Sequence, residues 1–309
     1  SWSVFGVAEE KGLIGKGEGE LGEIEKEWGV DIVLQQLDYE TCLTSYGNRS
    51  SDAVCITNMD ILAPSLGRDS VAVLPTSTSV GADACIAVGI DAAQGLEGTP
   101  TYGLEKSVSQ YAFERGLQEL GLDPAKFEFK NMDPAVAAQG MQAGKVNSIM
   151  VWNPFVLQTL RDAEGSKRLF DSSSIPEEII DMVVVGKDSL EKTGGNDFAC
   201  AVIDTFYRVN KMLADADTGD ETLVALGTRF SSLELEDMKV VVKETQFYKT
   251  PDAALTLLGS EAFQNETMPK VVDFCVDHDM VEQKPTVGFG KADAQLNFDD
   301  SYIKKVQGK

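Results

Sequence analysis

The chain has 309 residues, and 43% of them are hydrophobic, as in ordinary soluble globular proteins. Its formal net charge of -23 argues against nucleic acid or an anionic membrane as a partner, because phosphate groups would repel most of its surface. No apolar run approaches the roughly 18 residues that span a bilayer, and no segment resembles a signal peptide. If the protein is exported, we therefore expect this sequence to be the mature form. This length favours two lobes of about 100 to 200 residues over a single core.

The first part of the chain predicts short helices and strands separated by glycine-rich loops. The expected elements are a helix over 2–12, a loop rich in glycine and glutamate over 15–22, a helix over 23–28, a strand over 31–35 and a helix that Asp38 caps and that ends near Gly47. The loop contains the spacing G-x-G-x-x-G from Gly17 to Gly22, but its glutamates would face a pyrophosphate and no clear strand precedes it. We therefore interpret it as a flexible surface loop.

A short apolar strand over 53–56 ends on polar residues. Its residues are uncharged and partly β-branched, which is typical of a buried parallel strand. Thr57, Asn58 and Asp60 then lie at its carboxyl end, where open α/β sheets bind ligands. The segment therefore predicts a ligand cleft.

From residue 72 onwards, strands and helices alternate. We expect strands over 72–74, 84–88, 127–129, 148–151 and 182–185, helices over 107–120, 134–143 and 198–215, a helix opening at Asn153 and Pro154, and largely helical sequence to about 279. The alternation implies an α/β fold with two lobes. Lobe 1 would comprise 1–88 and 184–309 and lobe 2 would comprise 89–183, with a hinge near Val88 and Val183.

Three motifs resemble one family, namely Tyr46 through Asp60, Ser107 to Tyr111, and Val151 to Phe155. Together they are similar to the periplasmic solute-binding components of ABC importers in the nitrate/sulfonate/taurine superfamily. Within it, they resemble the branch associated with urea carboxylase operons and with urea- or guanidine-like solutes. The resemblance runs from Trp2 to about Val306, and it implies a strand before Trp2 that this sequence does not contain.

The resemblance implies the two-lobed type II periplasmic-binding-protein fold, in which each lobe is a mainly parallel sheet flanked by helices and the ligand cleft lies between the lobes. It also implies transport without catalysis. A periplasmic or extracytoplasmic protein of this kind captures a small nitrogen-containing solute by hinge closure and delivers it to the permease subunits of an ABC transporter. We expect a monomer with no cofactor and no metal. Taurine, sulfonates and nitrate are the alternative solutes.

Two groups of observations predict opposite charges for the solute. If several predicted helix N-termini converge on the cleft, their amides and dipoles favour an anion; these lie near Asn58, Ser107, Asp133 and Asn153. The side chains favour the opposite sign, because carboxylates lie in or beside these loops whereas the only cations nearby are Arg68 and Lys106. Two tryptophans, Trp2 and Trp152, could present aromatic faces to a cation or a flat amidine-type group. A planar donor such as guanidinium or urea fits this set better than a small anion.

Each candidate residue also has a purely structural interpretation. Asp133 before Pro134 is typical of a helix N-cap, and Asp83 could be a turn residue at the entry to a strand. Glu105 could interact with the dipole of the following helix, while the serines at its start could cap it. The predicted ligand-binding set is Trp2, Thr57, Asn58, Asp60, Asp83, Glu105, Ser107, Ser109 and Trp152.

The cysteines and the single histidine argue against metal-binding, redox and enzymatic functions. The five cysteines show no Cys-x-x-Cys spacing, so the sequence indicates neither a zinc site nor a thioredoxin-like motif. A pyrimidine-synthase-type enzyme of thiamine formation shares the fold, but such enzymes carry a cysteine cluster and functional histidines, whereas His278 is the only histidine here. A third alternative, an interaction protein without a ligand, would have an apolar and filled cleft.

Overall fold

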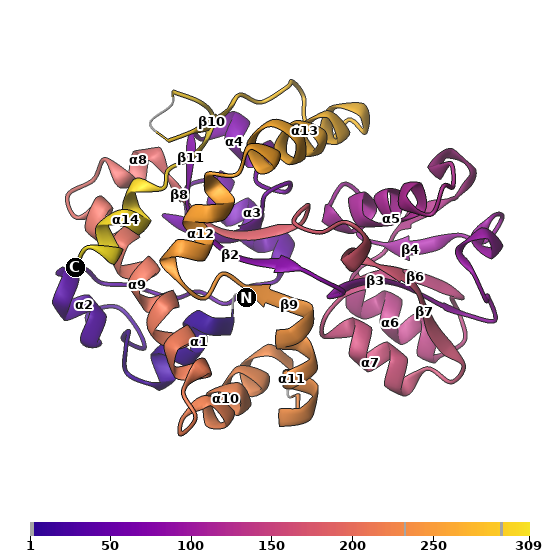
Figure 1. The fold of residues 1–309 in the computed structure, drawn as a ribbon, viewed down its shortest axis with the longest axis horizontal. Helices are drawn as coiled ribbons and strands as arrows, with labels where there is room; N and C mark the ends of the chain where they lie inside the picture. The colour runs from indigo at the N-terminus through magenta and orange to yellow at the C-terminus, as the bar shows by residue number, and fades with distance from the viewer. Residues whose placement is uncertain (1–2, 232, 291–292) are drawn as a thin grey trace. The chain divides into compact units, whose positions relative to one another are not determined.

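The computed structural model describes residues 3–231, 233–290 and 293–309 (Figure 1). The chain forms two compact units. Unit 1 comprises Ser1–Ser77, Ile180–Met238 and Phe247–Lys309, and unit 2 comprises Thr78–Ile179 and Lys239–Gln246. Two of the passages between the units occur within strands β2 (Ser70–Ser79) and β9 (Thr245–Phe247). Val88, one of the predicted hinge residues, ends strand β3 in unit 2, and Val183 lies within β8 in unit 1.

Unit 1 is built on a mixed sheet. Its strand order is β1-β8-β2-β11-β10, and β9 pairs with β2. The strands are β1 (Ala53–Thr57), β8 (Ile180–Gly186), β10 (Val287–Phe289) and β11 (Leu296–Phe298). β11 runs parallel to β2 and β10, whereas β1 is an edge strand that pairs antiparallel with β8. The prediction that the strand over 53–56 has a parallel neighbour was therefore wrong, because its neighbour β8 returns from unit 2 in the opposite direction.

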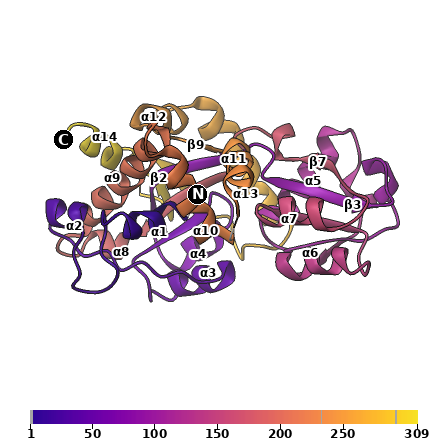
Figure 2. The same ribbon diagram turned by 90° about the horizontal axis from the view of Figure 1, so that it is seen from below.

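A long helix, α9 (Gly195–Ala214), organises the helical part of unit 1. It contacts α1, α2, α8, α10 and α14. Figure 2 shows β2 between α12 on one side and α3 and α4 on the other. The remaining helices of unit 1 are α1 (Ser3–Glu10), α2 (Glu23–Trp28), α3 (Tyr39–Gly47), α4 (Leu62–Gly67), α8 (Lys187–Leu190), α10 (Gly219–Ser231), α12 (Pro251–Leu258), α13 (Met268–Asp277) and α14 (Ser301–Gln307), and α11 (Leu235–Glu244) runs from unit 1 into unit 2. None of the helices in the described ranges is long and apolar enough to cross a membrane.

Unit 2 has a five-stranded sheet in the order β5-β4-β6-β3-β7. Its elements are β3 (Asp83–Val88), β4 (Thr101–Gly103), β5 (Phe129–Asn131), β6 (Ser148–Trp152), β7 (Ser166–Asp171), α5 (Val108–Glu119), α6 (Pro134–Gln142) and α7 (Phe155–Asp162). β4 is parallel to β5 and β6, whereas β3 is antiparallel to β6 and β7. The helix α5 covers one face of the sheet, and α6 and α7 cover the other (Figure 1). Both sheets are thus mixed, where mainly parallel sheets were expected.

The core of unit 2 follows from the alternation of side chains along its strands. Ala84 and Ile86 of β3, with Ile149 and Val151 of β6, are fully buried and pack in one cluster with residues of α6 and α7. Successive residues of a strand point to opposite faces, so the intervening residues face α5. This buried sheet fixes the ends of β3 and β6, where several candidate residues lie.

The loop over 15–22 lies at the surface, as predicted, since residues 16 and 18–21 are exposed, but both of its ends are fixed. The buried carboxylate of Glu25 accepts hydrogen bonds from the backbone N–H groups of Gly15 and Gly22, each at 2.6 Å, and of Ile32 at 2.5 Å. A side chain at Gly15 is excluded, because its Cβ would lie 1.4 Å from the carbonyl oxygen of Glu20. The glycines therefore permit a close turn around Glu25.

The strand predicted over 31–35 is not formed. Ile32 is 7% exposed and packs inward, which explains the alternating pattern. Its N–H group, however, is bound by Glu25 at 2.5 Å rather than by a neighbouring strand. Alternating apolar residues indicate that one face of a segment is buried, but a strand also needs a neighbouring strand for its backbone hydrogen bonds.

Candidate functional site

Asp60 follows β1, in the turn before α4. Its Oδ2 atom accepts hydrogen bonds from the Tyr39 hydroxyl at 2.7 Å and from Thr57 Oγ1 at 2.9 Å. Thr57 Oγ1 in turn accepts from the N–H of Asp60 at 3.1 Å. Thr57 is buried and Asp60 is half-buried. These bonds fix the turn, and they place two hydroxyl donors on one carboxylate oxygen.

Tyr39 was missed by the sequence analysis. Burial and the neighbouring charge of Asp60 raise the pKa of Tyr39 well above its usual range, so its hydroxyl stays protonated and donates to Asp60. Burial, together with the charge of Asp60, also raises the pKa of Cys275 to about 12. The position of Tyr39 directly after the N-cap Asp38 gave no signal of this contact, which joins residues of α3 to the end of β1.

Asn58 is fully buried. Its N–H donates to the carbonyl of Ile180 at 2.8 Å, its Oδ1 accepts from the N–H of Ile180 at 3.0 Å, and its Nδ2 lies 3.6 Å from Met268 Sδ. The side chain therefore ties the end of β1 to the start of β8. Trp2, another predicted ligand residue, lies outside the described residues.

Asp83 begins β3 and is buried in unit 2. The Ser79 hydroxyl donates to Asp83 Oδ2 at 2.6 Å and lies 2.7 Å from the Ser172 hydroxyl. Ser172 Oγ also accepts from the N–H of Gly81 at 2.8 Å. Asp83 thus belongs to a polar cluster that joins the start of β3 to the turn after β7.

Trp152 ends β6 and pairs with Asp83 in the antiparallel register of β3 and β6. Its half-buried ring makes an edge contact with Phe155, with 6.1 Å between the ring centroids. The next residue, Asn153, donates from Nδ2 to Glu244 at 2.8 Å, and Arg168 donates to the other oxygen of Glu244 at 2.9 Å. Asn153 belonged to the motif Val151 to Phe155 but was not predicted as a ligand residue, and no local signal indicated Glu244.

Ser107 and Ser109 lie at the start of α5. Ser107 is its N-cap, and its Oγ accepts from the N–H of Ser109 at 3.1 Å and donates to the carbonyl of Leu104 at 2.7 Å. Ser109 is fully buried, and its Oγ has no hydrogen-bond partner within the described ranges. Glu105 is exposed, and its N–H donates to Asn131 at 3.0 Å. Ser107 therefore has the capping role, while the Ser109 hydroxyl is not used by the helix.

Asp133 caps α6. Its Oδ1 accepts from the N–H groups of Ala135 at 2.9 Å and Val136 at 3.0 Å. This confirms the N-cap interpretation of Asp133 before Pro134.

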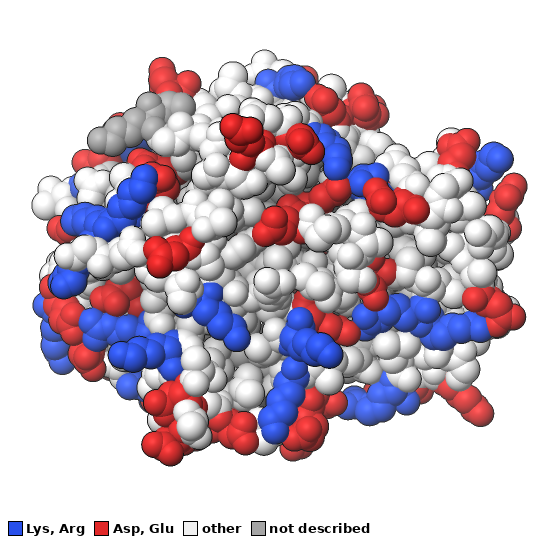
Figure 3. Space-filling model, in the orientation of Figure 1, with Lys and Arg blue, Asp and Glu red and all other residues white. Residues whose placement is uncertain are grey.

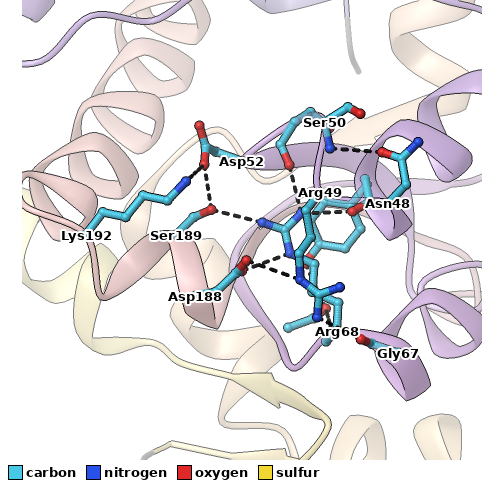
Figure 4. Close-up of polar contacts among 12 residues, drawn as sticks. Asn48, Arg49, Ser50, Asp52, Gly67, Arg68, Asp188, Ser189 and Lys192 are labelled. Atoms are coloured by element: carbon cyan, nitrogen blue, oxygen red, sulfur yellow. Dashed lines mark hydrogen bonds and ion pairs between the residues drawn. The ribbon is translucent and has the colours of Figure 1, made fainter.

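The buried guanidinium of Arg68 is bound entirely within unit 1 (Figure 4). It donates to the Asp188 carboxylate at 2.9 Å, to the Ser189 hydroxyl at 2.9 Å, and to the carbonyls of Tyr46 and Ser51 at 2.9 and 2.7 Å. Asp188 also pairs with Arg49, across 3.5 Å. Arg68 thus links α3, α4 and α8, and each nitrogen of its guanidinium group donates a hydrogen bond within unit 1.

The net charge does not itself mark a site. On the face drawn in Figure 3, acidic and basic side chains lie beside one another without a large region of one sign. Among the described residues, no group of three or more His, Cys, Asp or Glu side chains is arranged to hold a metal ion.

No protein-family model and no curated protein matches this chain, but several solved structures share its fold. The periplasmic aliphatic sulphonate binding protein SsuA from Escherichia coli has a TM-score of 0.70 at 18% identity, over 92% of this chain and 86% of that chain. The alkanesulfonate-binding protein SsuA from Xanthomonas axonopodis pv. citri bound to MOPS has a TM-score of 0.72 at 14% identity, over 91% of each chain. The periplasmic nitrate-binding protein NrtA from Synechocystis PCC 6803 has a TM-score of 0.60 at 14% identity, over 99% of this chain and 85% of that chain. These similarities confirm the predicted periplasmic-binding-protein fold.

Proposed function

We propose that this protein is the extracytoplasmic solute-binding component of an ABC importer. The observation that carries the proposal is a fold shared, over more than nine-tenths of the chain, with two sulfonate-binding proteins and a nitrate-binding protein. In this proposal the chain acts as a monomer, binds one small solute by hinge closure of its two units, and passes it unchanged to permease subunits. The predicted lobes and hinge remain part of this proposal.

We further propose that the solute is nitrogen-containing, of the urea, guanidine or amine class. Support comes from two arginines whose guanidinium groups are already bound within the protein. Arg68 donates to Asp188 and to backbone carbonyls, and Arg168 donates to Asp171 and Glu244, each within 2.9 Å. The proposed ligand set remains Trp2, Thr57, Asn58, Asp60, Asp83, Glu105, Ser107, Ser109 and Trp152.

A sulfonate or nitrate is the second candidate solute. It is favoured by the ligands named for the proteins of similar fold and by the start of α5, where the buried hydroxyl of Ser109 has no partner in the described part of the chain. A helix N-terminus attracts anions through its free N–H groups and its dipole.

Calorimetric titration of the whole chain tests both the solute-binding function and the class of solute. The probes are guanidinium, urea, methylamine, taurine, an alkanesulfonate and nitrate. We expect saturable binding of guanidinium or urea and weak or absent binding of the anions. Binding of none of these solutes would contradict the transport function, whereas binding of the alkanesulfonate or nitrate alone would contradict a urea-, guanidine- or amine-like solute.

Asp60→Ala tests the role of Asp60 in the same assay. Removing the carboxylate partner of a buried cation costs roughly 2 to 5 kcal/mol of binding free energy, so we expect guanidinium binding to weaken far more than that of any sulfonate. Asp133→Ala is the matched control, because it removes a carboxylate that only caps α6. Unchanged guanidinium affinity in Asp60→Ala would remove Asp60 from the site.

A further inference from the structure

The side-chain amide of Asn153 has a chemically fixed orientation. Its Nδ2 lies 2.8 Å from Glu244 Oε2, and a carboxylate oxygen can only accept a hydrogen bond. Arg168 donates to the other oxygen of Glu244 at 2.9 Å and to Asp171 at 2.8 Å, so Glu244 is held in place. The nitrogen of the amide must therefore face Glu244, and the oxygen must face away from it.

That oxygen, Asn153 Oδ1, is a buried acceptor. Asn153 is 3% exposed, and its Oδ1 has no hydrogen-bond partner among the described residues. A buried acceptor without a donor is destabilising and calls for an explanation. Asn210 and Asn297 also have an unpaired Oδ1, so this property alone does not identify a binding residue.

The surroundings of Asn153 differ from those of Asn210. It directly follows Trp152, whose register partner across β3 and β6 is Asp83, and its own N–H donates to the carbonyl of Ala82 at 2.8 Å. By contrast, Asn210 lies within the helix α9 and donates to the carbonyl of Phe206 one turn earlier. Asn153 thus carries its unpaired acceptor at the end of β6, next in sequence to an aromatic residue whose register partner is a buried carboxylate.

The backbone beside Asn153 is closely packed against the residues that orient it. Gly81 has φ of +102°, and a Cβ at this position would lie 3.2 Å from Arg168 Nη1 and 3.6 Å from Glu244 Cγ. A glycine here lets the turn before β3 approach the Arg168–Glu244 pair. This packing restricts the movement of Glu244 and, through it, the direction of Asn153 Oδ1.

We propose that Asn153 is a ligand residue whose Oδ1 accepts an N–H group of the solute, and that Glu244 is its positioning residue. The inference rests on the proposed solute-binding function and narrows the solute to one that carries an N–H donor. An oxyanion without donors, such as nitrate, would meet the lone pairs of Oδ1 and be disfavoured there. Trp152 would supply the aromatic face and Asp83 the nearby negative charge.

Titration of the full chain with guanidinium, urea and nitrate tests this assignment through three variants. Loss of one hydrogen bond corresponds to roughly a two- to tenfold loss of affinity when both groups are neutral and to roughly a 10- to 150-fold loss when one is charged. We therefore expect the smaller factor for urea and the larger one for guanidinium in Asn153→Ala. Asn210→Ala is the control, since it removes a buried amide with the same unpaired oxygen in another part of the fold. The double variant Asn153→Asp with Glu244→Gln restores an acceptor, because the glutamine amide can donate to the new carboxylate while its oxygen accepts from Arg168. We expect it to bind guanidinium at least as well as the wild type.

The outcomes separate this inference from the function on which it rests. If the wild type binds guanidinium or urea and Asn153→Ala loses no more affinity than Asn210→Ala, the role of Asn153 is refuted while the solute-binding function stands. If the wild type binds none of the probes, or nitrate alone, both this role and the nitrogenous solute are refuted. Thermal unfolding of each ligand-free variant shows whether it is folded. If Asn153→Ala is unfolded, the affinity of the double variant still tests the role of residue 153.

Discussion

Replacing Glu25 by glutamine is expected to destabilise unit 1 strongly. Glu25 is 0% exposed, and its two carboxylate oxygens accept three backbone N–H groups at 2.5 to 2.6 Å. As the third residue of α2, it reaches back to the N–H of Gly22, the N-cap, as in a capping box. It also holds Gly15 and Ile32, so a single side chain joins the loop before α2 to the segment after it.

The size of the effect follows from counting acceptors. A glutamine side chain has one acceptor oxygen in place of two, and its NH2 group would face an N–H donor. If the oxygen keeps the two bonds to Gly15 and Gly22, the N–H of Ile32 is left buried without a partner. One unsatisfied buried group costs about 1 to 3 kcal/mol, and bonds to a charged group are stronger than neutral ones, so the total is about 2 to 5 kcal/mol.

Thermal unfolding followed by circular dichroism measures this loss. For a domain of this size, a loss of 1 kcal/mol in unfolding free energy lowers the unfolding midpoint by about 2 to 4 °C, so the midpoint should decrease by about 5 to 15 °C. Glu18→Gln is the matched control, because Glu18 lies exposed in the same loop and its midpoint should stay unchanged. A Glu25→Gln midpoint equal to that of Glu18→Gln would refute the structural role of the buried carboxylate.

Three further predictions concern stability and thiol chemistry. Partial burial raises the pKa of Asp171, but hydrogen bonds from Ser173 and Arg168 outweigh it and hold the pKa below its ordinary value of 3.8; the stability that Asp171 contributes is therefore present above that value and lost as the pH falls through the lower folded-state pKa. Asp171→Asn should lower the midpoint at pH 7 and flatten its decline below about pH 4, and an equally steep decline in both proteins would contradict this. Gly186→Ala should cost about 1 to 3 kcal/mol by overpacking, because its Cβ would lie 2.3 Å from Arg68 Nε; thermal unfolding checks this against Gly47→Ala, whose Cβ has open space. All five cysteines are free thiols, so mass spectrometry should find five alkylations after unfolding without reductant, and a smaller number would reveal a disulfide. In the native protein at pH 8, alkylation should be slow at the three thiols whose pKa burial raises to about 12, namely Cys55, Cys85 and Cys275.

Local signals in the sequence predicted local structure well. Asp38, Ser107 and Asp133 were each expected at the start of a helix, and each accepts a hydrogen bond from a backbone N–H group of that first turn. A cap needs only residues within three positions of one another, so the sequence contains the whole of the information. The predicted positions of α3, α5 and α6 were confirmed for the same reason.

Long-range contacts could not be predicted in this way. Asp60 was expected to end a strand beside a ligand, but its contact with Tyr39 depends on how α3 packs against β1. Asn153 meets Glu244 across 91 positions of sequence, and neither residue carries a local sign of the other. The three-residue strands β9, β10 and β11 were missed because so short a run shows no periodicity, and the six-residue strand β7 was missed as well.

The contacts around Arg68 and α5 sharpen the question of the solute's charge. An anion in a dry site needs a cation or several free N–H groups, and three of the donors near these elements have an internal use in the described residues. Arg68 is held by Asp188, the N–H of Ser109 is taken by the Ser107 hydroxyl, and the N–H of Lys106 is taken by Gln110 Oε1. The oriented oxygen of Asn153 is instead a buried acceptor without a partner among the described residues. Under the proposed function, a solute that brings its own N–H donors would therefore find a partner in Asn153 Oδ1, whereas a solute that brings only lone pairs would not.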